Sequence, residues 1–188
     1  MMHLFTVATM MVALLATGAV RADGGDAHAS TPPPKIERPA HFKLADASNS
    51  VDALVARVLD ALAKNDPAAL HRLRVTETEY RSFIIPGSVK PGESPQVLDE
   101  ESSRGAWGWI DTNSKYAVDS IIKKYGGHTY RLKGTEFAKG QKEYAWYTAY
   151  KVTVLTLEDE KGTEGELVLG SVADVDGQFK FISLLGDL

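Results

Sequence analysis

Residues 121–133, IIKKYGGHTYRLK, mark a change in the spacing of apolar side chains along the chain. Before Gly126 these side chains recur every three to four residues, which is the spacing of a helix with one buried face. Beyond Gly127 they alternate with polar ones, as in a strand with one buried face. The change predicts an α+β fold in which N-terminal helices pack on an antiparallel sheet of four or more strands.

Three helical segments are predicted before residue 87. The first carries one apolar stripe, with Ser50 or Asn49 as its N-cap. The second opens at Asp66-Pro67, where an N-cap precedes proline at the first helical position. Thr76 and the glutamate three residues later form a capping box that starts the third. The stripe of the first segment consists of Val51, Leu54, Val55, Val58, Leu59 and Leu62.

Two more helices are expected after a loop at residues 87–96, which contains two prolines and two glycines. Residues 97–110 are predicted as one helix, although Gly105 and Gly108 weaken it. Residues 114–125 are predicted as a separate helix that ends at Gly126 as its C-cap.

Four strand segments are predicted beyond Gly127, at residues 130–132, 144–157, 167–175 and 179–185. Asp176-Gly177 predicts a two-residue hairpin turn, and residues 159–162 a looser one. The hairpin would pair Val172 with Phe181 on one side of the sheet and Leu169 with Leu184 on the other. The second apolar face must be covered by another element or by a partner subunit, and we favour a homodimer through the outer face of the sheet.

The N-terminal segment predicts export. Residues 4–20, LFTVATMMVALLATGAV, are apolar and short for a membrane span, and the run ends at Val20-Arg21-Ala22 with small side chains where a signal peptidase expects them. We interpret residues 1–22 as a signal peptide cleaved after Ala22. Because no Lys or Arg precedes Leu4, the alternatives are an uncleaved anchor or a mis-assigned start. The chain has no cysteine, so an exported domain stands without disulfides. A periplasmic or secreted protein without stable membrane insertion after cleavage is expected.

The segment that follows is rich in proline, alanine and glycine, and has no apolar period. Residues 23–50 are therefore interpreted as a flexible tether, and residues 51–188 as a single α+β domain.

Charge is distributed unevenly in a chain of net charge −4. Residues 115–151 are rich in lysine and arginine, interleaved with tyrosines. An acidic total and an exported location argue against nucleic acid as a partner, so a solvated basic face is the preferred interpretation.

The order of elements resembles the nuclear-transport-factor-2-like superfamily, which includes the SnoaL and ketosteroid-isomerase-like proteins. The resemblance rests on the long helix, the break at residues 63–70 (AKNDPAAL), further helix and a final four-stranded meander. It implies a strongly curved, cone-like sheet wrapped round the helices, with a ligand often held at the mouth of the cone. In particular, the chain resembles small exported bacterial members without an assigned activity, and no catalytic residue transfers by motif.

The motifs of several enzyme classes are missing from the sequence. No pair of histidines has the spacing of metal ligands, and Asp174-Val175-Asp176-Gly177 lacks the rest of a calcium loop. Nucleophile and phosphate-loop motifs are also missing. We expect neither a metal nor a cofactor.

Acid–base chemistry needs only a carboxylate or histidine in an apolar pocket beside a phenol or indole. Glu136 is the first candidate for such a base, because alternation places it on the strand face of Tyr130 and Leu132. His71 and Asp174 are further candidates. With Glu136 or Asp174 as base, the chain would be a cofactor-free isomerase or lyase of a small apolar substrate.

We favour a different function, an exported non-enzymatic binding module, because the chain has many aromatic residues and no catalytic motif. Its cleft would lie between Trp107, Tyr130 and Trp146 and would take a small apolar ligand. The candidate ligand-binding residues are Tyr80, Trp107, Tyr130, Trp146 and Tyr150.

Overall fold

The computed structural model describes residues 36–185, which form an α+β domain of helices and two antiparallel sheets. The predicted signal peptide at residues 1–22 and the first part of the predicted tether, residues 23–35, lie outside the described residues. Within residues 36–185, no helix has both the length and the apolar content needed to cross a bilayer.

The first two helices begin where their caps predict. Helix α1 (Val51–Ala63) starts after Ser50, whose side chain accepts a hydrogen bond from the Ala53 N–H at 3.0 Å. Helix α2 (Pro67–Arg72) starts after Asp66, whose carboxylate accepts from the Ala69 N–H at 2.9 Å. Each cap satisfies a backbone donor that the first helical turn leaves free.

The capping box also forms, and the helix that it opens changes type. Thr76 and Glu79 exchange side-chain and backbone hydrogen bonds around α3 (Glu77–Glu79). A π-helical turn, η1 (Tyr80–Ile84), and the short α4 (Ile85–Gly87) continue the same helix. The end predicted at Gly87 is confirmed.

One helix, α5 (Glu100–Tyr125), replaces the two that were predicted between residues 97 and 125. Its N-cap is Asp99, and its C-cap is Gly126, as predicted. The glycines inside it, Gly105 and Gly108, are exposed and meet no neighbouring atom. Each costs about 1 kcal/mol relative to alanine, and the helix continues because its opposite side packs into the core.

The strands form a meander in two sheets. Strands β1 (Arg131–Phe137), β4 (Thr153–Glu158) and β5 (Glu164–Val168) make the sheet ordered β1-β4-β5. The second sheet has the order β2-β3-β6-β7. Its members are β2 (Gln141–Glu143), β3 (Thr148–Tyr150), β6 (Val172–Val175) and β7 (Gln178–Phe181).

Residues 148–158 and residues 164–174 pair with each other in one continuous register that runs through both sheets. Thr148 pairs with Asp174 in the second sheet, and Glu158 pairs with Glu164 in the first. Between them, the Leu169 N–H donates to the Thr153 carbonyl at 2.7 Å. The prediction of four long strands in meander order is therefore confirmed. Each of the first three long strands is interrupted once.

The interruption between β3 and β4 falls at Val152, which has φ +55°. A β-branched residue rarely adopts this left-handed conformation, and here it resets the side-chain alternation. Tyr150 and Leu155 consequently contact the same apolar cluster, although they are five residues apart. The first cluster joins α1, α2, α5 and both sheets; its large members include Leu54, Val58, Leu62, Leu70, Ile121, Leu155, Leu167, Leu169, Val172, Phe181 and Leu184.

The predicted pairing of Val172 with Phe181 is confirmed. The prediction that Leu169 and Leu184 lie on the other side of the sheet is wrong, because both belong to the first cluster. The irregular residues 169–171 between β5 and β6 cause this change of side.

A second cluster covers the other face of the second sheet. Ala149, Ala173 and Val175 pack there with Phe83 and Ile84 of η1. The sheet thus has two apolar faces, as the pattern indicated, but the chain itself covers both. The second sheet therefore has no uncovered apolar face of the kind that suggested a dimer.

Residues 36–50 pack on the domain, so the tether prediction is wrong for them. Leu44 is buried in the second cluster, and the Phe42 ring stacks on Phe83 at 4.0 Å. Ser48 exchanges two backbone hydrogen bonds with Phe179, at 3.1 and 2.8 Å. These few apolar residues have no period, yet each fills a gap in a cluster formed by distant segments.

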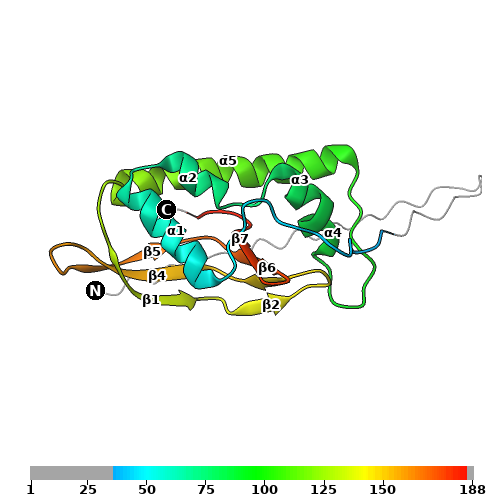
Figure 1. Ribbon diagram of the computed structural model, residues 1–188. Helices are drawn as coiled ribbons and strands as arrows, with labels where there is room; N and C mark the ends of the chain where they lie inside the picture. The colour runs from blue at the N-terminus through cyan, green and yellow to red at the C-terminus, as the bar shows by residue number, and fades with distance from the viewer. Residues whose placement is uncertain (1–35, 186–188) are drawn as a thin grey trace, which may run out of the picture. The chain divides into compact units, whose positions relative to one another are not determined.

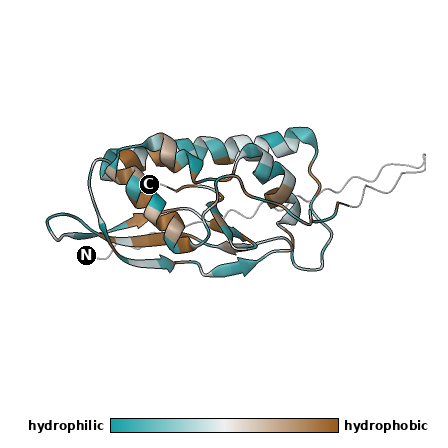
Figure 2. Cartoon of the chain, viewed as in Figure 1, coloured by the Kyte–Doolittle hydropathy of each residue, from teal (hydrophilic) through white to brown (hydrophobic). Residues whose placement is uncertain are grey.

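The layers are visible in the ribbon view. Helix α5 lies along one side of the domain and the strands lie along the opposite side; α1 crosses between them, and α2 lies beside α5 (Figure 1). The hydrophobic residues gather on α1 and on β4 and β5, toward the interior (Figure 2).

Candidate functional site

The carboxylate predicted as a base does not lie in a pocket. Glu136 is exposed on β1, because the register shifts between Leu132 and Gly134 and places Glu136 on the opposite face from Leu132. The expectation that these two residues share a face is therefore wrong. Asp174 accepts the Gly177 N–H at 2.8 Å and so fixes the β6–β7 hairpin turn.

The structure divides the predicted aromatic residues among separate places. Tyr80 and Trp107 lie together, with ring centroids 5.7 Å apart. Trp146 is buried in the second cluster against Phe83. The other two lie elsewhere: Tyr130 packs on Tyr125 at 6.1 Å, and Tyr150 on Phe137 at 4.7 Å. The cleft expected between Trp107, Tyr130 and Trp146 is not formed as one site.

A different pocket, of about 430 Å³, contains an unusual group of charges. The end of α2, the following residues 74–76, helix α5, strand β7 and residues 45–46 surround it. It is lined by Ala45, Asp46, His71, Arg72, Arg74, Val75, Thr76, Trp107, Asp111, Lys115 and Lys180. Trp107 is one of the predicted ligand-binding residues, and His71 was a candidate for acid–base chemistry.

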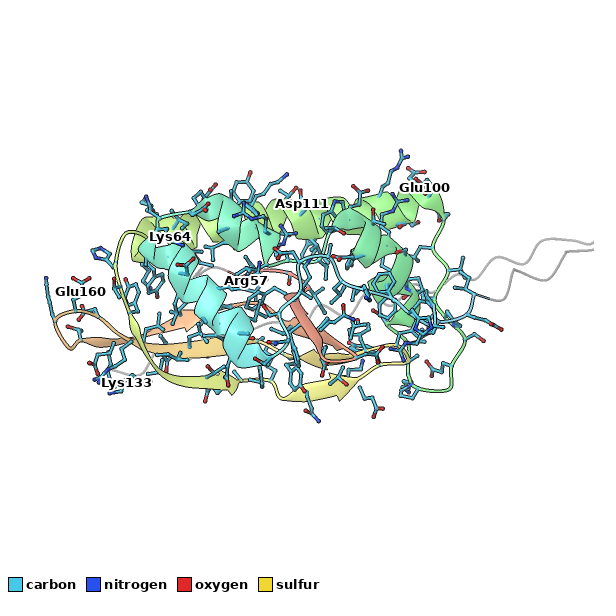
Figure 3. All side chains as sticks on the ribbon, viewed as in Figure 1. Arg57, Lys64, Glu100, Asp111, Lys133 and Glu160 are labelled. Carbon is cyan, nitrogen blue, oxygen red and sulfur yellow. The ribbon has the colours of Figure 1, made fainter. Side chains whose placement is uncertain are left out.

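Backbone pairing holds Arg74 in the wall of this pocket. The Val75 N–H donates to the Phe181 carbonyl at 2.8 Å, and the Phe181 N–H donates to the Leu73 carbonyl at 2.9 Å. Leu73 and Val75 thereby enter the two apolar clusters. The side chain between them extends to α5, where Nη1 of Arg74 lies 3.3 Å from Oδ1 of Asp111. Figure 3 shows Asp111 near the middle of α5.

Two nitrogen atoms of Arg74 have no acceptor. The side chain is 3% exposed, and both Nε and Nη2 are buried without a hydrogen bond. Among the buried side-chain atoms of residues 36–185, the others without a partner are the hydroxyls of Thr135 and Thr153. The guanidinium also lies over the Trp107 ring, 5.5 Å from its centroid. Burial lowers the pKa of Arg74, and the nearby Asp111 opposes that effect.

The positive charge of Arg74 is only partly compensated. Its carboxylate partner, Asp111, also receives Lys115 Nζ at 2.7 Å, so two cations share one anion. Burial acts to raise the pKa of Asp111, but hydrogen bonds and charge from Lys115 and Arg74 outweigh it and lower that pKa. Lys180, which also lines the pocket, has its own partner in Glu79 at 3.0 Å. An excess of positive charge therefore remains at Arg74.

Comparison of the chain with protein-family models, with curated proteins and with solved structures returned no match.

Sequence reasoning missed Arg74 as a functional residue. The signal that could have found it is the tripeptide Leu73-Arg74-Val75, a cation between two apolar residues at the end of a helix. A buried arginine is rare unless it is paired, but burial of this position depends on β7, which lies about a hundred residues further along the chain.

His71 beside the pocket gives a prediction on pH. Burial lowers its pKa below the ordinary 6.5, and the charge of Arg74 adds to the effect. The unfolded chain therefore binds a proton more readily than the folded one, so stability is full above about pH 6.5 and falls as pH drops toward the folded pKa. We expect a His71→Gln variant to lose this part of the pH dependence, measured as urea midpoints between pH 7.5 and 5. A variant that retains the wild-type slope would contradict the assignment; His128→Gln is the control.

Proposed function

We propose that the protein is a binding module that holds a small carboxylate ligand at Arg74. The observation that carries the proposal is the buried guanidinium beside a pocket of about 430 Å³, with Nε and Nη2 unpaired. Leaving a buried charged donor unpaired costs about 1–3 kcal/mol or more, and a bound acceptor would remove that cost.

The position of the two free nitrogens favours a carboxylate. Nε and Nη2 lie on one edge of the planar guanidinium, and this edge matches the two oxygens of a carboxylate in a bidentate pair. Asp111 occupies the opposite side of the group through Nη1. A ligand with one carboxylate would thus complete the coordination of Arg74 and supply the missing negative charge.

Trp107 would contact the rest of the ligand. Its half-buried indole packs on the Arg74 guanidinium and forms part of the pocket wall. Because Nε and Nη2 are covered, the ligand reaches them when this indole moves aside, and an apolar group on the ligand then packs against it. The proposed ligand therefore has the apolar group that was expected from the sequence and, in addition, a carboxylate.

The enzyme alternative has less support. An isomerase or lyase needs a carboxylate base in an apolar pocket, whereas Glu136 is exposed and Asp174 is bonded within a hairpin turn. Membership of the nuclear-transport-factor-2-like superfamily and export also remain proposals, supported by the element order and by residues 4–20 respectively.

A titration followed by NMR tests the proposal. The Arg74 Nε–H gives its own ¹H–¹⁵N signal, which an Arg74→Met variant identifies by its loss. We expect phenylacetate to shift this signal saturably, and the neutral phenylacetamide to leave it unchanged. Arg74→Met should weaken phenylacetate binding at least about 10-fold, because a charge-assisted pair is lost.

Arg72→Met is the matched control, because Arg72 lines the same pocket but is 60% exposed. Its removal lowers the charge equally and should change affinity little. Equal losses for both variants would show non-specific attraction and contradict the proposal. So would the absence of any saturable shift with phenylacetate, benzoate and hexanoate.

A further inference from the structure

We propose that the outer face of α5 binds a second copy of this chain, with the two α5 helices antiparallel. The outer face is defined here by Gly105, Trp109, Thr112 and Tyr116. The inference is independent of the Arg74 pocket, because the site residues on α5, among them Trp107 and Asp111, face the interior side of the helix.

Two large aromatic side chains on this face are exposed. Trp109 is 72% exposed and Tyr116 is 70% exposed, the highest values among the large hydrophobic residues between 36 and 185. They are seven residues apart, so they lie above one another on the helix. An isolated exposed aromatic needs no explanation, but two on one face of a helix are typical of a contact surface.

The residues around them have the spacing of a helix–helix contact. Gly105, Trp109, Thr112 and Tyr116 follow at intervals of four, three and four, which is the a/d pattern of a coiled coil. Gly105 has no neighbouring atom where a Cβ would be, so a second backbone can approach there. In Figure 2 the side of α5 turned away from the strands is teal or white, so no long aliphatic stripe competes with this arrangement.

The charges of α5 select an antiparallel pair. Its first turn is acidic, with Glu100 and Glu101, and its last turn is basic, with Lys123 and Lys124. Arg81 and Arg104 of the same chain already pair with Glu100, so the attraction between two copies rests on Glu101 and Lys123, and it exists only when the helices run in opposite directions. Glu100 marks the acidic end in Figure 3. A two-fold axis near Thr112 then sets Trp109 of each copy beside Tyr116 of the other.

The size of the face predicts a weak dimer. A helix of 26 residues is about 39 Å long, and a contact about 10 Å wide along it covers ~400 Å² on each copy. Stable interfaces cover about 800 Å² per partner. We therefore expect a dimer that forms in the micromolar to millimolar range.

Single cysteines test the geometry, since the chain has none of its own. Thr112→Cys lies next to the proposed axis, and its two copies should form a disulfide under mild oxidation. Lys123→Cys is the control: in the antiparallel pair its two copies are about 31 Å apart along the helices, so no cross-link should form. A cross-link at both positions would show a parallel pair. The absence of a cross-link at both positions would show that the helices do not pair through this face. Either result overturns the proposal.

Charge reversal tests the same model without cysteine. In sedimentation velocity from 5 to 500 µM, Glu101→Lys and Lys123→Glu should each weaken association at least about threefold, and the double variant should restore it. Trp109→Ser should abolish it, whereas Val97→Ser, an exposed apolar residue outside α5, should not. A monomer at all concentrations would refute the proposal. Val168 lies on the sheet, at the end of β5. If Val168→Glu loses the dimer and Trp109→Ser keeps it, the dimer forms through the outer face of the sheet and the α5 proposal is wrong.

Discussion

A Gly170→Ala variant is expected to lose about 3 kcal/mol of folding free energy or more. A Cβ at this position would overlap the Ser183 carbonyl group. Both sides of the overlap are backbone, so no side chain can rotate away to relieve it. The surrounding hydrogen bonds also resist movement, since the Thr153 N–H donates to the Gly170 carbonyl at 3.2 Å.

Urea unfolding measures this loss, with Gly108→Ala as the control. Gly108 lies exposed on α5, with nothing within 4 Å of the position that a Cβ would take. Alanine there should stabilise the helix by about 0.5–1 kcal/mol. If the free energy of unfolding of Gly170→Ala lies within about 1 kcal/mol of the wild-type value, the close approach of these two segments is refuted.

Removing the charge of Glu79 is expected to destabilise the fold by about 3–5 kcal/mol. Glu79 and Lys180 form an ion pair of 3.0 Å, with side chains 6% and 2% exposed. The carboxylate also accepts the Thr76 N–H at 2.6 Å and the Ala45 N–H at 2.5 Å. The Glu79 side chain therefore joins the start of α3, residues 36–50 and β7.

A Glu79→Gln variant leaves the Lys180 ammonium buried without its counter-ion, and this accounts for the size of the effect. The double variant Glu79→Gln, Lys180→Met removes both charges and should regain most of the stability. The surface pair Lys64–Asp60 supplies the control, since Lys64→Met should change the free energy of unfolding by about 1 kcal/mol or less. Equal, small losses in urea unfolding for Glu79→Gln and Lys64→Met would contradict this account.

Local signals predicted the elements well. Ser50, Asp66 and Thr76 each begin a helix, and Asp176-Gly177 forms the hairpin turn, because each acts within three or four residues of itself. The continuity of α5 was missed, because propensity argued against Gly105 and Gly108 while packing of the far side of the helix decided the outcome.

The candidate site was predictable only in part. Trp107 and His71 were named from the sequence and do line the pocket, but Glu136 was assigned to the wrong face. Strict alternation holds only in an uninterrupted strand, and one register shift after Leu132 reverses it. The burial of Arg74 was beyond local reasoning, since Phe181 and Asp111 create it from distant parts of the chain.

The amino-acid sequence by itself determined the α+β class, the starts of α1, α2 and α3, the meander of strands and the absence of thiol chemistry. Tertiary structure decided which residues share a face, that residues 36–50 belong to the domain, and that a guanidinium without enough acceptors lies beside a pocket. The physical reason is range: capping and periodicity act between neighbours in the chain, whereas burial and charge compensation are set by groups that only folding brings together.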